Sequence, residues 1–161
     1  MRNKVELLAS LARLRNARSL SLFLSAGVFT LVSSWTLADR EDLAINNARA
    51  VFNYQMNCQG CHTPDGAGVM SVPDLRGEMG NFLKLQAGRE YLVRVPGSAN
   101  STLSNEHLAE VLNWMLLEYA GASLSEDWRP YSAQEVGEHR RNPLYEVVEH
   151  RRNLIADFSG N

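Results

Sequence analysis

Helical spacing of apolar residues is the clearest pattern along this chain. Residues 44–57 carry such residues on two adjacent helical stripes: Ala44, Ala48, Val51 and Phe52 on one, Ala50 and Tyr54 on the other. A further helix is predicted from Ser104, a suitable N-cap, with Leu103 and Leu108 at the positions of a hydrophobic staple. Its apolar side follows helical spacing as far as Gly121, which ends the run: Leu108, Val111, Leu112, Met115 and Tyr119.

Two shorter helices are predicted in the C-terminal segment, residues 122–161. Ser132 and Glu135 form a capping box for the first, and Tyr131 and Val136 stand at its staple positions. The dipeptide Asn142-Pro143 predicts the start of the second, as an N-cap followed by proline at the first helical position. One side of that helix carries mostly apolar residues at helical spacing: Leu144, Val147, Arg151, Leu154, Ile155 and Phe158. The pattern predicts an amphipathic hairpin that packs back on the preceding domain.

The first 38 residues have the pattern of an export signal. Basic residues come first: Arg2, Lys4, Arg13, Arg15 and Arg18. An uncharged run of 20 residues, 19–38, follows and ends in Thr-Leu-Ala before an acidic stretch. This order predicts a secretory signal peptide over residues 1–38. The run is also long enough to span a bilayer, so a retained membrane anchor is the alternative. In both cases the remainder of the chain is exported.

Without the leader, the chain is acidic. Residues 39–161 hold 11 basic and 17 acidic residues, a net charge of −6. Nucleic acids and anionic membrane surfaces need a basic face, so we expect neither as a partner of this part of the chain. Its length fits one compact domain with a modest core. The patterns divide it into residues 39–121 and a helical extension over 122–161.

The candidate chemistry lies in CQGCH, residues 58–62, which holds both cysteines of the chain. A disulfide between Cys58 and Cys61 would close a very small loop and stabilise little. Structural zinc sites usually need a second ligand pair, and a thioredoxin-like pair needs a βαβ context. The C-x-x-C-H spacing is typical of covalent haem attachment. Two thiols three residues apart can bond both vinyl groups of one porphyrin, and His62 then lies beneath the iron as its proximal ligand.

With these flanks, the sequence resembles the class I c-type cytochromes over roughly residues 43–120. Ala50 and Tyr54 match the small and aromatic residues that stand eight and four positions before the first cysteine of that family. The resemblance implies that they meet an aromatic on the C-terminal helix, here Trp114. The segment GVMSVPDLRG resembles the turn after the family's motif, REYLVRVPG (89–97) its middle helix, and 103–121 its closing helix.

The resemblance implies a mainly α protein: a cytochrome c-like helical haem domain with a C-terminal helical hairpin extension. It implies one covalently bound haem c, attached through Cys58 and Cys61. It also implies that His62, the proximal ligand, donates a hydrogen bond to the region of Pro73.

The sixth iron ligand departs from the family's pattern. Class I carriers usually supply a methionine shortly before the last helix, and the corresponding segment, VPGSANSTLS (95–104), contains none. Met79 is the predicted distal ligand, because Gly77 and Gly80 flank it in a segment that could fold over the haem. The other candidates are Met70, Met115 and His107, and an open or weakly ligated iron is the remaining alternative.

Arginines supply two further candidates for function. Arg76, Arg89 and Arg94 could reach haem propionates, since a guanidinium matches a carboxylate well. The C-terminal segment repeats EHRRN at 138–142 and 149–153. The arginines of the two copies could form a docking patch for an acidic partner: Arg140, Arg141, Arg151 and Arg152. The alternative, which also covers His139 and His150, is a pair of solvated helix faces with intrahelical ion pairs.

These features predict an exported monohaem electron carrier rather than an enzyme. Its donor would be a periplasmic quinoprotein or flavoprotein dehydrogenase, and its acceptor an oxidase or another cytochrome. We expect it in the periplasm, or tethered to the inner membrane if residues 19–38 are retained. The alternative is a haem-based small-ligand binder or sensor, or a peroxidase-like protein, with an open iron that the missing methionine would explain.

Overall fold

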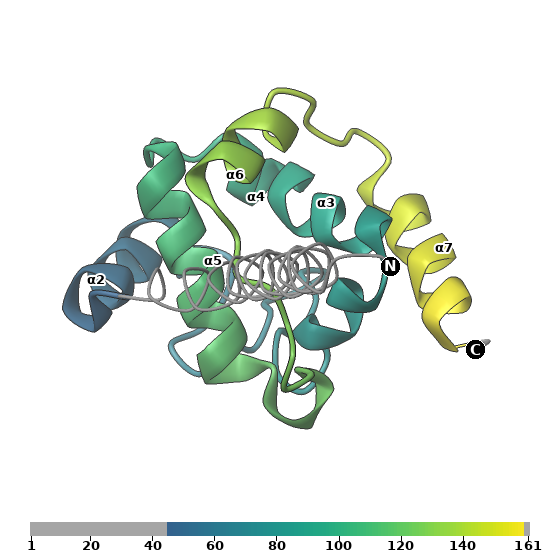
Figure 1. The fold of residues 1–161 in the computed structure, drawn as a ribbon. Coiled ribbons are helices and arrows are strands. Elements are labelled where there is room, and N and C mark those ends of the chain that lie inside the picture. Colours follow the sequence, from purple (N-terminus) through teal and green to yellow (C-terminus); the bar gives the residue numbers. More distant parts are fainter. Residues whose placement is uncertain (1–44, 160–161) are drawn as a thin grey trace, which may run out of the picture. The chain divides into compact units, whose positions relative to one another are not determined.

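The computed structural model describes residues 45–159, which contain helices, turns and loops and no strand (Figure 1). The order is α2 (Asn47–Asn57), η2 (Met79–Lys84), α3 (Gln86–Arg94), α4 (Pro96–Ala99), α5 (Asn105–Tyr119), η3 (Gly121–Ser123), α6 (Ala133–His139) and α7 (Val147–Ser159). The mainly α prediction is confirmed. The predicted export signal, residues 1–38, lies outside the described residues. Within 45–159, no helix is both long enough and apolar enough to cross a membrane.

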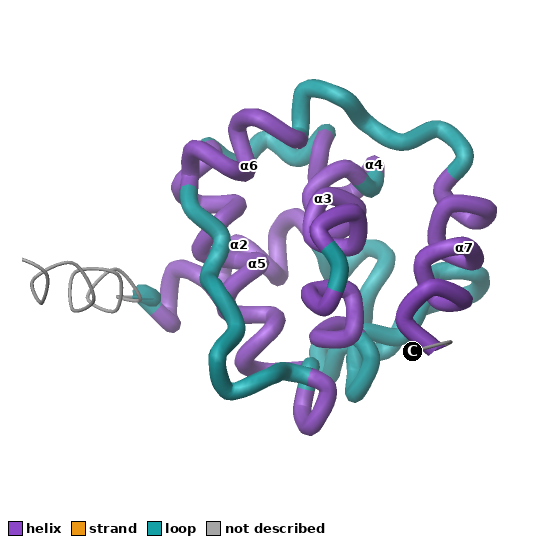
Figure 2. Tube along the Cα trace, turned by 45° about the vertical axis from the view of Figure 1, so that its right-hand side comes forward, coloured by secondary structure: helices purple, strands orange, loops and turns teal. Residues whose placement is uncertain are grey.

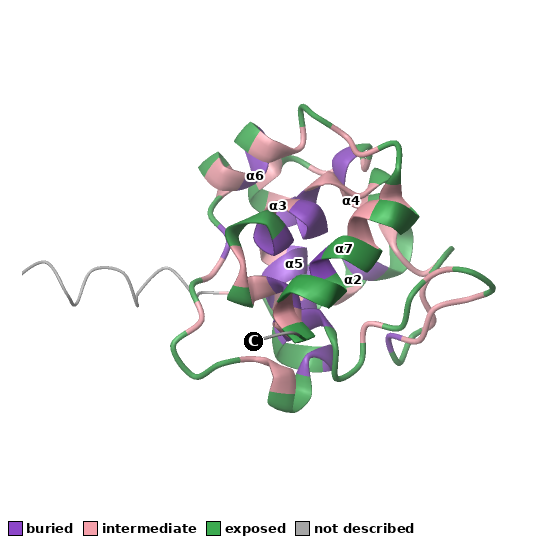
Figure 3. Ribbon diagram, turned by 90° about the vertical axis from the view of Figure 1, so that its right-hand side faces the viewer, coloured by how far each residue is buried: buried purple, intermediate pink, exposed green. Residues whose placement is uncertain are grey.

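Helix α5 is the central element, with α2, α6, η2 and η3 in contact with it. Ser104 caps it as predicted, because its hydroxyl accepts a hydrogen bond from the backbone N–H of His107 at 3.3 Å. The apolar stripe of this helix is buried along its whole length: Leu108, Val111, Leu112, Met115 and Tyr119. Figure 3 shows the buried residues concentrated on α3 and α5.

Helix α2 packs on α5 through the predicted pair of residues. Ala50 and Tyr54 are buried, and the rings of Tyr54 and Trp114 lie 5.2 Å apart between their centroids. The other apolar stripe of α2 does not join the core, since Phe52 is 59% exposed. The contact between α2 and the closing helix is therefore made by the stripe on which the resemblance to class I cytochromes rests.

Helix α6, the first helix of the C-terminal segment, begins at its predicted cap. The Ser132 hydroxyl accepts from the N–H of Glu135 at 3.1 Å, and the staple residues Tyr131 and Val136 are both buried. The reciprocal half of the capping box is missing, because the Glu135 carboxylate instead accepts from Arg89 of α3. Gly137 allows α6 to lie close to α5: a Cβ there would stand 2.4 Å from the Asn105 side chain. These contacts join α6 to the preceding helices α3 and α5.

Helix α7 starts later than predicted. Asn142-Pro143 does not begin it; the first helical residue is Val147. Tertiary hydrogen bonds hold the preceding residues, since the N–H of Leu144 donates to the Arg94 carbonyl at 2.9 Å and Arg94 Nε donates to the Asn142 carbonyl at 2.8 Å. These bonds fix a loop between α6 and α7, which Figure 2 shows as a long connection. Helix α7 then packs on η2 and α3.

Candidate functional site

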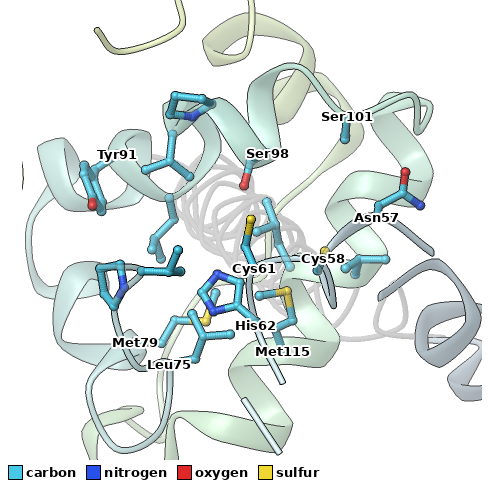
Figure 4. A pocket seen from close by; sticks show the side chains of 18 of the residues that line it. Asn57, Cys58, Cys61, His62, Leu75, Met79, Tyr91, Ser98, Ser101 and Met115 are labelled. Carbon is cyan, nitrogen blue, oxygen red and sulfur yellow. The ribbon is translucent and has the colours of Figure 1, made fainter. Parts of the chain in front are cut away.

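The CQGCH segment begins where α2 ends. Cys58 is the C-cap of α2, and its N–H donates to the Tyr54 carbonyl at 2.8 Å. The N–H groups of Cys61 and His62 both donate to the Cys58 carbonyl, at 3.0 and 2.9 Å. This turn places Cys58, Cys61 and His62 in the lining of one cavity (Figure 4). Both thiols are free.

The loop that follows His62 folds back on itself and forms the wall of the cavity beside this residue. His62 forms an isolated antiparallel bridge with Gly68, and Thr63 N–H donates to the Ala67 carbonyl at 2.7 Å. A Cβ on Gly68 would stand 1.9 Å from the Val72 carbonyl oxygen, so only glycine fits there. The segment of Val72 and Pro73 can therefore lie beside His62 in the lining of the cavity.

The cavity has a volume of about 380 Å³, within the range of about 300–1,000 Å³ that is usual for ligand sites. Its walls come from η2, α3, α5, the segment 95–103 and α7. Most of the lining is apolar, as in Phe82, Leu92, Val95, Val111 and Leu112. In Figure 4 the His62 ring and the Cys61 thiol point into the cavity, with Ser98 on its far side.

The residues at this cavity fit a covalently bound haem. Burial lowers the pKa of His62, against an opposing effect of the Asp74 charge, and so favours the neutral imidazole that binds iron. Its Nδ1 atom is buried and has no hydrogen-bond partner in the described part of the chain, so the bond expected to the Pro73 region is not formed. Burial and the neighbouring Cys61 raise the pKa of Cys58 to about 11. Thiols for two vinyl groups, an imidazole for the iron and apolar walls for the porphyrin thus occur together.

The structure separates the candidates for the sixth ligand. Met79, the first residue of η2, and Met115 of α5 are both buried and line the cavity. Met70 is fully exposed, and neither it nor His107 of the first turn of α5 is among the lining residues. Met79 therefore stays the predicted distal ligand, with Met115 as its nearest competitor.

None of the three arginines expected at the propionates lines the cavity. Arg76 pairs with Asp65 and Asp74, at 2.7 Å each. Arg89 is buried against Glu135 at 2.9 Å, and Arg94 bonds the Asn142 carbonyl. Each guanidinium already has a protein partner, so the described residues give no support to a contact between these three arginines and the propionates.

Arg151 of α7 is the arginine that the cavity does contain. The sequence placed it in a possible docking patch with Arg140, Arg141 and Arg152. Its position on the apolar side of the helix, between Val147 and Leu154, was the signal that it faces inward. Arg140 is not free for docking either, because its guanidinium bonds backbone carbonyls of residues 99–103.

Comparisons with known proteins agree with this site. Residues 45–118 match the family model described as Cytochrome c. Two curated proteins named cytochrome c-552, both from Thermus thermophilus, are each 29% identical over 106 residues. The alignments cover 54% of this chain, and 81% and 72% of those two proteins. No solved structure gives a significant match. The family match over residues 45–118 and the two related cytochromes, together with the mainly helical fold, support a class I c-type cytochrome.

Proposed function

We propose that this chain is an exported electron carrier with a single haem c. Its family transfers electrons with covalently bound haem. The observation that carries the proposal is the convergence of Cys58, Cys61 and His62 on one apolar cavity. The sequence holds one C-x-x-C-H segment and no other cysteine, which supports one haem.

The roles of the chain's own residues follow from their surroundings. The bound haem would supply a one-electron iron couple. Cys58 and Cys61 would hold it through thioether bonds, and the neutral His62 imidazole would ligate the iron. The apolar walls would keep water from the bound haem, and burial of this kind is one of the means by which a protein sets a haem's reduction potential.

Export and partner choice rest on the sequence and the charge of the chain. Residues 1–38 have the pattern of a signal peptide, and a periplasmic dehydrogenase of the quinoprotein or flavoprotein class would then be the donor. An oxidase or another cytochrome would be the acceptor. Residues 45–159 hold 14 acidic and 10 basic residues, a net charge of −4, which suits weak and polar docking to a basic partner face.

Covalent haem is the first point to test. The parent and the double variant Cys58→Ser, Cys61→Ser would be exported with the haem-attachment machinery and compared on a denaturing gel stained for haem. We expect stain with the parent alone, and a redox titration of the parent that fits a one-electron couple. A parent without covalent haem would refute the proposal, as would a double variant that keeps haem through denaturation.

The fate of the leader needs a separate measurement. The mass of the intact holoprotein separates the cleaved form from the anchored one. A mass that starts near Asp39 and includes one haem would support a periplasmic carrier. A full-length mass in the membrane fraction would instead support a tethered carrier.

One observation favours a second function, a haem-based binder of small ligands. The segment 95–103, where class I carriers usually place their methionine, lines the cavity with Ser98 and Ser101 among apolar residues. Serine hydroxyls are not ligands that these cytochromes use for haem iron. If Met79 does not bind the iron, the sixth position would be open to small molecules such as carbon monoxide.

A further inference from the structure

We propose that Arg151 of the C-terminal helix α7 binds a propionate of the haem, which makes the extension part of the haem site. This inference rests on the proposed function, because it requires haem in the cavity. The cytochrome c family model matches residues 45–118, whereas Arg151 lies beyond them. The family match therefore does not assign this contact.

The charge of the cavity lining points to an anion near Arg151. Haem carries two propionates, which are negatively charged at neutral pH. Among the described residues that line the cavity, Arg151 is the one arginine or lysine. Asp74 is the one carboxylate in that lining, and it is already paired with Arg76 at 2.7 Å. Arg151 is thus a permanent positive charge at the cavity, and the acidic residue of the lining, Asp74, is neutralised by Arg76 instead.

Arg151 is held in place without being neutralised. Its guanidinium carbon lies 4.9 Å from the centroid of the Phe82 ring, on which it packs as a cation–π pair. No ion pair joins it to a carboxylate within residues 45–159. The Tyr91 hydroxyl also interacts with this guanidinium. A guanidinium has five N–H donors, so one such contact and an aromatic ring on its face leave donors for a propionate.

Helix α7 is anchored on both sides of Arg151. Val147, one turn earlier, also lines the cavity, and Leu154, about one turn later, is buried in the core. The ring of Phe158 meets that of Phe82 edge-on, with 5.3 Å between centroids. His150 stacks on Tyr91 at 6.0 Å. Because these contacts fix the backbone of α7, little conformational freedom remains for Arg151 to lose on binding an anion.

A cation bound to a propionate has a measurable consequence. Positive charge near the haem favours the ferrous form, which carries one positive charge less than the ferric form. Removal of that charge should therefore lower the reduction potential. A guanidinium that only packs on Phe82 and Tyr91 would affect stability, and its loss would leave the propionate unchanged.

The test uses the complete holoprotein with three variants. Arg151→Gln removes the charge, Arg151→Lys keeps the charge without the paired donors, and Arg152→Gln removes a neighbouring exposed charge on the same helix as the matched control. The midpoint potential of each is measured at one pH and ionic strength. We expect a lower potential for Arg151→Gln than for Arg152→Gln, with much of the difference recovered by Arg151→Lys.

A second readout addresses the propionate itself. Haem made from aminolaevulinate labelled with carbon-13 in its carboxyl carbon carries the label in its propionates. The infrared bands of the labelled carboxylates should shift in Arg151→Gln and in Arg151→Lys, and should stay in place in Arg152→Gln. If Arg151→Gln does not bind haem, the infrared bands of Arg151→Lys are compared with those of the parent and of Arg152→Gln instead.

The outcomes separate this inference from the proposed function. A parent protein without covalent haem overturns both. Haem that is bound, with the same potential and the same carboxylate bands in Arg151→Gln as in Arg152→Gln, overturns the role of Arg151 alone. Loss of thermal stability in Arg151→Gln without either spectroscopic or redox change would also overturn it, because that pattern belongs to a packing residue.

Discussion

Two methionine side chains, Met79 and Met115, line the same cavity but are held differently. Met79 starts a short 3₁₀ helix between Glu78 and Leu85, and its N–H donates to the Leu75 carbonyl at 3.2 Å. Met115 lies in the interior of the 15-residue helix α5, on its buried stripe. A short 3₁₀ segment adjusts more readily than the interior of a long helix. At the scale of single residues, we therefore expect Met79 rather than Met115 to bind iron.

The first prediction tests that difference. In the ferrous parent, carbon monoxide should leave the visible spectrum unchanged, because a bound Met79 sulfur occupies the sixth position. Met79→Ala should open that position and give a shifted spectrum. Met115→Ala, a matched truncation in the same lining, should behave as the parent does. A shift in the parent itself would mean an accessible iron and would favour the ligand-binding function.

The buried pair of Arg89 and Glu135 is a second feature at this scale. Both side chains are almost completely buried, and Arg89 also donates to the backbone carbonyl of Arg129 at 2.6 Å. Burial alone would raise the pKa of Glu135, but hydrogen bonds from Arg89 and Arg129 outweigh it, so the pKa lies below its ordinary value of 4.5. Loss of one partner would leave the other charge buried without compensation.

We therefore expect Glu135→Gln to lower the free energy of unfolding by about 3–5 kcal/mol. Glu90→Gln is the control, because Glu90 and Arg94 form a half-exposed pair at 4.0 Å whose loss should cost about 1 kcal/mol or less. Guanidinium chloride titrations of the holoproteins measure both. Because the folded-state pKa of Glu135 is depressed, the parent's advantage is complete above pH 4.5 and declines as the pH falls further through the folded-state value. Equal losses in the two variants would contradict this account.

At the scale of elements, the end of α6 holds one wall of the cavity. The Arg140 guanidinium donates to the carbonyls of Ser101 and Leu103 at 2.7 Å each, and to that of Ala99 at 3.3 Å. Ser101 and Leu103 line the cavity, in the segment between α4 and α5. The first half of the extension thus holds a segment that lines the cavity, and α7 contributes Val147 and Arg151 to the same lining.

Arg140→Gln should loosen that segment while leaving the rest of the fold in place. Hydrogen bonds from a charged donor contribute about 1.5–3 kcal/mol each, so a loss of about 2 kcal/mol in local stability, roughly thirty-fold in exchange rate, is expected for the amides of residues 99–103. Hydrogen exchange measured by mass spectrometry reports this segment directly. Arg141→Gln, at the exposed neighbouring position, should leave the exchange unchanged. Uniform acceleration over the whole chain would indicate global destabilisation instead.

At the scale of the whole molecule, the charge of the chain should govern its encounters. Residues 45–159 carry a net charge of −4, and haem propionates would add further negative charge. A negative surface attracts cationic redox reagents and repels anionic ones, and salt screens both effects. The same forces would act on a protein partner during docking.

The effect of this negative charge can be measured, without knowledge of the natural partner, from the rates of electron transfer with small charged metal complexes. The rate with cationic hexaammineruthenium should fall as the salt concentration rises, and the rate with anionic ferricyanide should rise. Both should approach a plateau near 1 M salt, where the screening length is about 3 Å. Stopped-flow measurements over a salt series provide the test. Opposite slopes would show that the region around the haem edge is basic in spite of the net charge.

Local sequence was sufficient for much of the fold and for the centre of the site. Helical spacing and the caps Ser104 and Ser132 depend on residues within about one turn of each other, so they could be recognised without a structure. The C-x-x-C-H spacing is local in the same way, and it led to the haem family. The contact of Tyr54 with Trp114 followed from the resemblance to that family, and the structure confirms it.

Long-range contacts decided the remaining features. The partner of Arg89 lies 46 residues away in Glu135, and a hydrogen bond from Leu144 to Arg94 delays the start of α7. Arginine side chains are long and find their partners through the packing of distant helices, which spacing along the chain does not reveal. For that reason the sequence alone indicated a helical c-type cytochrome and predicted its attachment residues in 58–62. Only the tertiary structure brought Arg151 and the C-terminal extension to the cavity, because that arrangement depends on how α7 packs against η2 and α3.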